Sequence, residues 1–85
     1  MTTKITQNRP IYSIASEINQ DWKKINYAAK PYLLAMEQLD RIDEKYFYDS
    51  AKTIILYFLC NAGQWRGEVA RRVKKELKDL TTIAK

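Results

Sequence analysis

The sequence predicts a small all-α domain, a compact bundle of about four helices with the third helix buried at its centre. The segment 54–60 is apolar without interruption, so it has to be covered on every side. Apolar residues elsewhere recur at helical spacing. No other segment alternates apolar and polar residues, so a strand at 54–60 would have no partner to pair with. With 85 residues, the chain has the size of one domain.

The first half of the chain predicts a tail and two helices. Residues 1–10 are polar, lack periodicity and end at a proline, so a flexible tail is expected. A helix is predicted over 11–24, where one stripe contains Ile11, Ile14, Ala15, Ile18 and Trp22. A second helix is predicted over 28–39, with Pro31 near its first turn. Residues 40–48 are charged and rich in tyrosine, and are expected to form a connection that reverses the chain direction.

The second half predicts the central helix and a basic one. The central helix is expected over 50–62, with Asp49 as its N-cap and Gly63 closing its C-terminal end. The last helix is expected over 65–80 and is the most amphipathic segment of the chain. Its apolar face is predicted to contain Val69, Val73, Leu77 and Leu80, and its opposite face Arg71, Lys74, Lys75 and Lys78. Residues 81–85 are expected to fray.

The residue types that carry most enzymatic chemistry are missing. The chain has no histidine and only two glycines, too few for a glycine-rich phosphate loop. Its one cysteine, Cys60, lies in the apolar run, where a small buried hydrophobe is expected in preference to a reactive thiol. The carboxylates of residues 40–49 match no calcium loop and are better explained as caps. We therefore expect no enzymatic activity, no metal and no cofactor.

Cysteine content and hydropathy also bear on the compartment. A single cysteine excludes an intramolecular disulfide, and no apolar stretch near the first residues resembles a signal peptide. The apolar run is far shorter than the about 20 residues that span a bilayer. A cytoplasmic protein without a membrane partner is expected. Because a chain of this length buries only a small core, a homodimer is one way in which it could gain stability.

The net charge of +5 lies almost entirely in the last helix. Residues 66–85 contain seven Lys and Arg residues against three Asp and Glu residues, which accounts for four of the five excess charges. A basic face can be simply solvated, or it can bind an acidic protein or a nucleic acid. The helix, turn and basic helix together have the outline of a helix-turn-helix. However, the lysines lie in the later turns, where they suit phosphates or water better than bases.

Several aromatic and turn residues have two interpretations. Trp22 and Trp65 lie in register with apolar stripes, which favours core packing over a role as exposed anchors. Arg66, followed by Gly67, either bridges the turn to a carboxylate such as Asp49 or Glu68 or meets a partner. A loop has less structural need of large aromatic residues than a helix does. A second candidate contact surface is therefore formed by Tyr46, Phe47 and Tyr48.

Several short motifs together resemble a family of small uncharacterised proteins encoded by bacteriophages and prophages. The resemblance covers most of residues 11–80 and implies a phage-borne accessory protein that acts inside a bacterial cell. It supplies no activity, ligand or catalytic residue, and Phe47 stands where a small residue is expected between the tyrosines. The motifs are Asp21-Trp22-Lys23-Lys24, Ala29-Lys30-Pro31-Tyr32-Leu33 with Ala35-Met36, Tyr48-Asp49-Ser50-Ala51-Lys52, and Asn61-Ala62 followed by Trp65-Arg66-Gly67-Glu68 with Ala70-Arg71.

These observations lead to one expected function and one alternative. The expected function is that of a non-enzymatic binding or regulatory protein that acts on a bacterial or phage protein. The alternative is a small nucleic-acid-binding protein that uses its basic C-terminal helix. Residues expected to matter for structure are Asp49, Trp65, Arg66 and Gly67, and residues expected to contact a partner are Arg71, Lys74, Lys75, Lys78, Tyr46, Phe47 and Tyr48.

Overall fold

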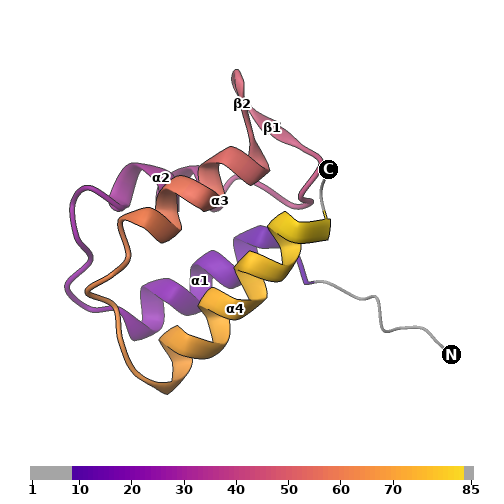
Figure 1. The fold of residues 1–85 in the computed structure, drawn as a ribbon. Coiled ribbons are helices and arrows are strands. Elements are labelled where there is room, and N and C mark those ends of the chain that lie inside the picture. Colours follow the sequence, from indigo (N-terminus) through magenta and orange to yellow (C-terminus); the bar gives the residue numbers. More distant parts are fainter. Residues whose placement is uncertain (1–8, 84–85) are drawn as a thin grey trace, which may run out of the picture.

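A computed structural model describes residues 9–83 and contains four helices and one small antiparallel sheet (Figure 1). The predicted helical bundle is confirmed, and the sheet was not predicted. The expected tail at 1–8 and the last two residues, 84–85, lie outside the described residues. In chain order the elements are α1 (Ile11–Asp21), α2 (Lys30–Met36), β1 (Lys45–Tyr46), β2 (Asp49–Ser50), α3 (Ala51–Cys60) and α4 (Glu68–Ile83).

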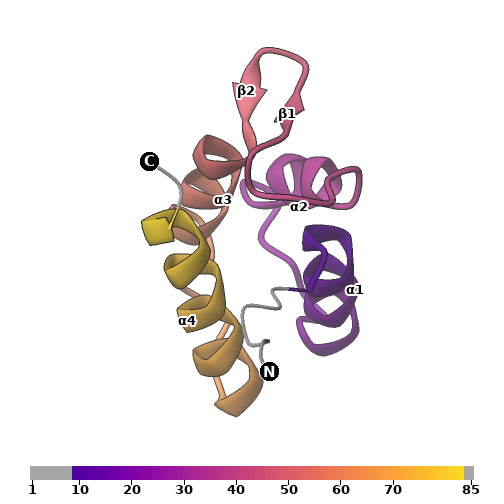
Figure 2. The same ribbon diagram turned by 90° about the vertical axis from the view of Figure 1, so that its right-hand side faces the viewer.

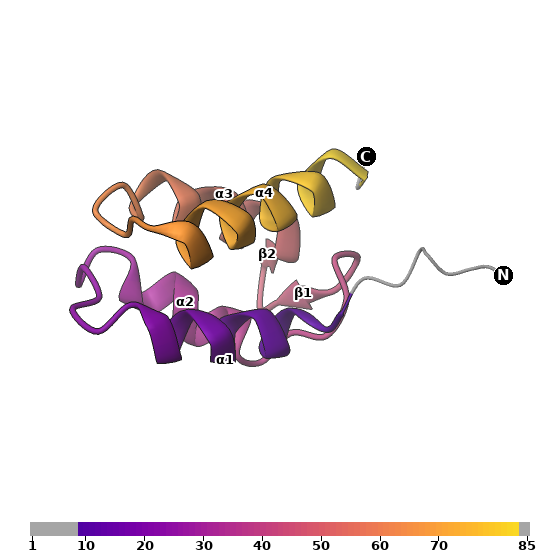
Figure 3. The ribbon, with the colours of Figure 1, turned by 90° about the horizontal axis from the view of Figure 1, so that it is seen from below.

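Each helix packs against two of the other three. Helix α1 contacts α2 and α4, and α3 contacts the same two helices from the other side. Figure 3 shows α1 and α2 in one layer and α3 and α4 in the other. The core lies between these layers. Its largest fully buried side chains are Trp65, Phe58, Ile11, Ile14, Ile18, Leu33, Met36, Leu39, Ile55, Leu77 and Val73.

The apolar run in α3 is only half buried, which corrects the prediction of a central third helix. Ile55 and Phe58 are fully buried, whereas Leu56 is 42% and Tyr57 51% exposed. Cys60 is also exposed and is therefore not the buried hydrophobe that was expected. The reason is geometric. A helix that occupies one corner of a four-helix arrangement is covered by its neighbours on one side and leaves its other face outside.

The ends of α3 are capped by residues other than those predicted. Ser50 is the N-cap, and its Oγ accepts a hydrogen bond from the backbone N–H of Thr53 at 3.1 Å. Asp49, the predicted cap, belongs to β2. At the other end Asn61 is the C-cap, and its Nδ2 donates to the carbonyl of Tyr57 at 2.9 Å. Gly63, which was predicted to close this end, does not have a positive φ. Of the two glycines, Gly67 has one, with a φ of 113°.

The two strands form a short hairpin within the expected connection. Lys45 pairs with Ser50 and Tyr46 with Asp49, so the turn between the strands has two residues, Phe47 and Tyr48. Figure 2 shows this hairpin projecting from the helices. Strands of two residues are too short to produce an alternating pattern, which is why the sequence did not indicate them.

The helix boundaries differ from the predicted ones at most ends. Helix α1 ends at Asp21 rather than at 24, because Trp22 is extended (φ −91°, ψ 96°). Helix α2 is shorter than 28–39, with turns on both sides of it. Pro31 lies in its first turn, as predicted. Helix α4 begins at Glu68 and continues past residue 80 to Ile83, because Thr81 is buried and its hydroxyl donates to the carbonyl of Lys78.

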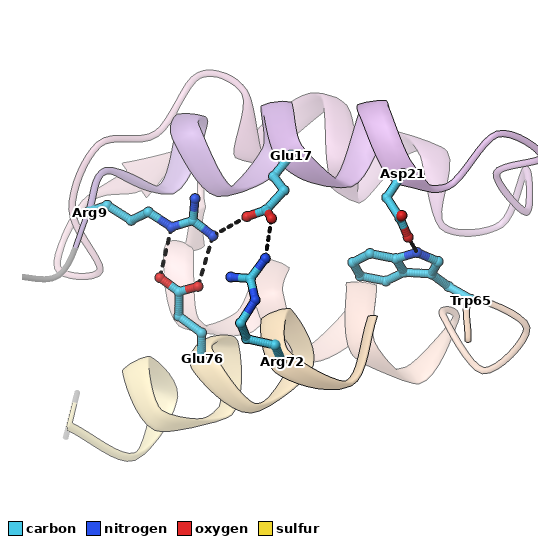
Figure 4. A network of polar contacts seen from close by, with 6 residues as sticks. All are labelled: Arg9, Glu17, Asp21, Trp65, Arg72 and Glu76. Carbon is cyan, nitrogen blue, oxygen red and sulfur yellow. Dashed lines mark hydrogen bonds and ion pairs between the residues drawn. The ribbon is translucent and has the colours of Figure 1, made fainter. Parts of the chain in front are cut away.

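Two arginines and two glutamates connect α1 to α4 (Figure 4). Arg9 donates to Glu17 at 2.6 Å and, through two nitrogens, to Glu76 at 2.9 Å. Arg72 of α4 also pairs with Glu17. The side chains of Glu17 and Glu76 are only 25% and 28% exposed, so these ion pairs are partly shielded from water. Arg9 was expected to belong to the flexible tail, and its contacts instead fix the chain immediately before α1.

Adjacent substitutions in α3 should test the half burial of the apolar run. Ile55→Ala should lower the free energy of unfolding by about 2–5 kcal/mol, because it opens a cavity in the core. Leu56→Ala, one residue later on the outer face, should lower it by no more than about 1 kcal/mol. Urea denaturation of both variants and the parent measures the difference. Equal losses for the two variants would show that Leu56 is covered as well.

The network around Glu17 should make stability depend on pH. Hydrogen bonds from Arg9 and Arg72 hold the pKa of Glu17 below its ordinary value of 4.5 in the folded protein. A carboxyl group with a lowered folded pKa stabilises the fold above its unfolded pKa, and this contribution is lost as pH falls through the folded pKa. Glu17→Gln should therefore be less stable than the parent near neutral pH, and should lose less stability below about pH 4.5.

The measurement for this prediction is the melting temperature as a function of pH. Glu37→Gln is the matched control in the same layer, because Glu37 accepts a hydrogen bond from the neutral amide of Asn19 at 2.9 Å. A pH dependence in Glu17→Gln identical to that of the parent would show that the ion pairs contribute nothing to folding.

Candidate binding surfaces

The hairpin carries the three aromatic residues predicted to form a contact surface. Tyr46 is half-buried and packs against the core. Phe47 is 81% and Tyr48 98% exposed, and we call these two residues the hairpin tip. The rings of Tyr46 and Phe47 are edge to face, with centroids 4.7 Å apart. Because β2 continues directly into α3, the capped first turn of α3 holds the base of the hairpin in place.

Phe47 has an unusual backbone conformation. Its φ is 59°, and it is the one non-glycine residue with a positive φ between residues 9 and 83. A two-residue turn between paired strands needs a positive φ at its first position, where glycine or asparagine is favoured. For another residue this conformation costs about 1–2 kcal/mol. The exposed ring of Phe47 offsets little of this cost through its contact with the ring of Tyr46.

The apolar and basic faces of α4 largely match the prediction. Val73, Leu77 and Leu80 are buried and Val69 is partly buried. On the opposite side Arg71, Lys75 and Lys78 are exposed. Lys75 forms an ion pair with Asp79 at 3.2 Å, one turn further along the helix. The basic face is therefore partly neutralised by one carboxylate of the same helix, that of Asp79.

Lys74 does not lie freely in solvent, which corrects its predicted placement. Its Nζ donates to the carbonyl oxygen of Trp65 at 2.6 Å and lies 5.9 Å from the centre of the Trp65 ring. Partial burial, followed by repulsion from Arg66 and Lys78, lowers the pKa of Lys74. The cause is the segment that precedes α4, which folds over the first turns of the helix and covers this lysine.

Trp65 and Trp22 both belong to the core, as predicted. Their rings are stacked, with centroids 5.8 Å apart and an angle of 10° between the planes. The indole N–H of Trp65 donates to Asp21 at 2.8 Å (Figure 4). These contacts hold the segment between α3 and α4 against the end of α1. The sequence did not indicate Asp21, because a partner 44 residues away leaves no local signal.

Arg66 forms neither of the predicted bridges. It is exposed and has no ion pair with any residue of the described range. Asp49 and Arg66 lie beyond opposite ends of α3, which explains why they do not meet. Arg66 instead borders a shallow hollow of about 340 Å³ at the start of α4. The residues that line this hollow are Trp65, Arg66, Gly67, Ala70, Arg71 and Lys74.

The carboxylates of residues 40–49 act locally. Asp43 pairs with Arg41 at 2.8 Å, and a carboxylate oxygen of Glu44 accepts from the backbone N–H of Asp40 at 2.8 Å. Over the described part of the chain, no three His, Cys, Asp or Glu side chains are placed to hold a metal ion. A second hollow, of about 300 Å³, lies between these residues and the ends of α1 and α4. Its lining is Arg9, Ile11, Asp40, Arg41, Ile42, Asp43 and Leu80.

The chain matches no protein-family model, no curated protein and no solved structure. Within residues 9–83, no helix is both long enough and apolar enough to cross a membrane. The hairpin tip exposes two large aromatic side chains, and the hollow at the start of α4 is lined by three cationic ones.

Two substitutions of Phe47 should test its backbone conformation. Phe47→Asn should be at least as stable as the parent, because asparagine tolerates a positive φ. Phe47→Val should be less stable by about 1 kcal/mol or more, because a β-branched residue is strongly disfavoured there. Thermal unfolding of the two variants measures the difference. If valine is tolerated as well as asparagine, the turn does not hold a positive φ in solution.

Proposed function

We propose that this protein is a non-enzymatic binding protein that acts on another protein, and that it docks through the hairpin tip. The observation that carries the proposal is the exposure of Phe47 and Tyr48, 81% and 98%, on a turn whose first residue is conformationally disfavoured. The isolated fold gains little from these two rings. A partner that buries them would gain considerably, since exposed aromatic residues on a fixed backbone are typical anchors of protein interfaces.

The charge around the hairpin favours a protein over a nucleic acid at this surface. Residues 40–49 contain four Asp and Glu residues and two Lys and Arg residues. A surface on which nucleic-acid bases stack is normally surrounded by cations that follow the phosphates. An acidic neighbourhood repels that backbone, whereas a protein partner can supply its own arginines or an apolar pocket.

The sequence supports the remaining parts of the proposal. The absence of histidine removes the commonest general acid and base, which supports a stoichiometric rather than a catalytic role. The resemblance to small bacteriophage and prophage proteins supports a bacterial or phage protein as the partner, met in the cytoplasm of a bacterial cell. A second copy of this chain would also fit this surface, and sedimentation of the protein alone distinguishes it from other proteins.

The proposal is tested by recovering partners from a bacterial lysate with the immobilised protein, with and without nuclease. The parent should recover one protein in a near-stoichiometric amount, whether or not nuclease is present. The double variant Phe47→Asn/Tyr48→Ser should weaken this binding by about thirtyfold or more, because loss of one interface anchor costs about 2 kcal/mol. Binding constants measured with the purified partner give the magnitude.

Tyr27→Ser is the matched control. Tyr27 is 88% exposed and lies in the turn before α2, away from the hairpin. This variant should bind as the parent does. Sedimentation of the protein alone identifies self-association. Recovery of a partner by the double variant at the parental level would contradict docking at the hairpin tip. Nucleic acid that is recovered by the parent and lost with nuclease would instead favour the alternative, binding through α4.

A further inference from the structure

The hollow at the start of α4 brings three cations together without a carboxylate. Arg66 precedes the helix, and Arg71 and Lys74 lie one and two turns into it, on the side that faces the hollow. Gly67 forms part of the floor, where an added Cβ would meet no atom within 4 Å. Figure 2 shows the start of α4 at the opposite end of the molecule from the hairpin. The two surfaces are therefore independent of each other.

Several charged residues nearby on α4 have partners, whereas Glu68 and Lys78, which do not line the hollow, form no ion pair among residues 9–83. Arg72 pairs with Glu17, Lys75 with Asp79 and Glu76 with Arg9. Across residues 9–83, neither Arg66, Arg71 nor Lys74 forms an ion pair. Like charges held close together repel one another; the pKa of Lys74 is lowered mainly by partial burial and further by repulsion from Arg66.

The hydrogen-bond donors at the hollow are largely unused. The Lys74 ammonium group has three donors and gives one to the carbonyl of Trp65, which fixes its position and leaves two. The guanidinium groups of Arg66 and Arg71 have no acceptor among the described residues. The volume of about 340 Å³ is near the lower limit of roughly 300–1,000 Å³ for ligand pockets. The hollow therefore suits a small anionic group.

We infer that this hollow binds a phosphate group of a phosphorylated ligand, held by Arg66, Arg71 and Lys74. Three cations around one site match the two negative charges and several acceptor oxygens of a phosphate better than the single charge of a carboxylate. Trp65 is 2% exposed, so no aromatic face is available on which a base could stack. Recognition is thus of the phosphate and not of a base.

The inference is tested by NMR titration of the full chain with inorganic phosphate, in which chloride is exchanged for phosphate at constant ionic strength. Backbone amide shifts should saturate and should be confined to residues 65–74. Bound phosphate should also raise the pKa of Lys74, because a nearby anion favours the charged ammonium. Shifts that grow linearly without saturation, or that spread evenly along α4, would overturn the inference, because ionic screening alone produces them.

Three charge-removing variants separate a built site from a generally basic helix. Arg66→Gln and Arg71→Gln should each weaken phosphate binding about tenfold, equivalent to about 1.4 kcal/mol. Lys78→Gln removes an exposed cation from the same helix that does not line the hollow, and should change the affinity by less than about twofold. Equal effects of all three would contradict the inference. Melting temperatures should stay close to that of the parent, since none of these three side chains forms an ion pair within residues 9–83.

Two further ligands identify the source of the phosphate. A short single-stranded DNA that competes with inorganic phosphate, and depends on Arg66 and Arg71, would identify a phosphodiester backbone. Competition by glycerol phosphate but not by the DNA would identify a phosphomonoester. If inorganic phosphate and both of these ligands fail to bind, the site does not exist. None of these outcomes depends on whether the hairpin tip binds a protein.

Discussion

The stacked rings of Trp22 and Trp65 hold the end of α1 against the segment that joins α3 to α4. Trp22 is the residue after α1, and Trp65 precedes α4. The stack therefore joins two parts of the chain that are distant in sequence. Phe58 of α3 places its ring edge-on to both tryptophans, with centroids 6.2 and 6.5 Å away. Since the hydrogen bond from Trp65 to Asp21 fixes the indole as well, the segment before α4 has little freedom. The direction in which α4 leaves this segment follows from these contacts.

The same contacts also create the cationic hollow. The carbonyl of Trp65 is held over the first turns of α4, and Lys74 bonds to it. Arg66, next in the chain, is thereby kept beside Lys74 although the two repel each other. A helical wheel of α4 correctly predicts which residues face the core, because that depends only on the spacing within the helix. It cannot predict that a neighbouring segment covers Lys74, because this depends on a tryptophan stack formed elsewhere.

Features of the fold that depend on residues close together in sequence could be predicted, whereas features that depend on contacts between distant residues could not. Burial of Ile14, Ile18 and Val73 follows from helical spacing, and the sequence indicated it. An unbroken apolar run has no periodicity, so the half exposure of Leu56 and Cys60 could not be read from it. The two-residue strands are too short for a pattern. At the hairpin the sequence indicated exposed aromatic residues in a loop, but it did not indicate the positive φ of Phe47, which depends on pairing of the flanking strands.

The packing of α1 against both α2 and α4 has a consequence for synthesis of the protein. Among the described helices α4 is synthesised last, and it supplies Val73, Leu77 and Leu80 to the core as well as the partners of Arg9 and Glu17. Until α4 has emerged, the inner faces of α1 and α3 are covered on one side only. The nascent chain therefore cannot complete its core step by step, and a ribosome that pauses within the codons for α4 holds a chain with exposed apolar surface. Such a pause is when the chain is most open to chaperones and proteases.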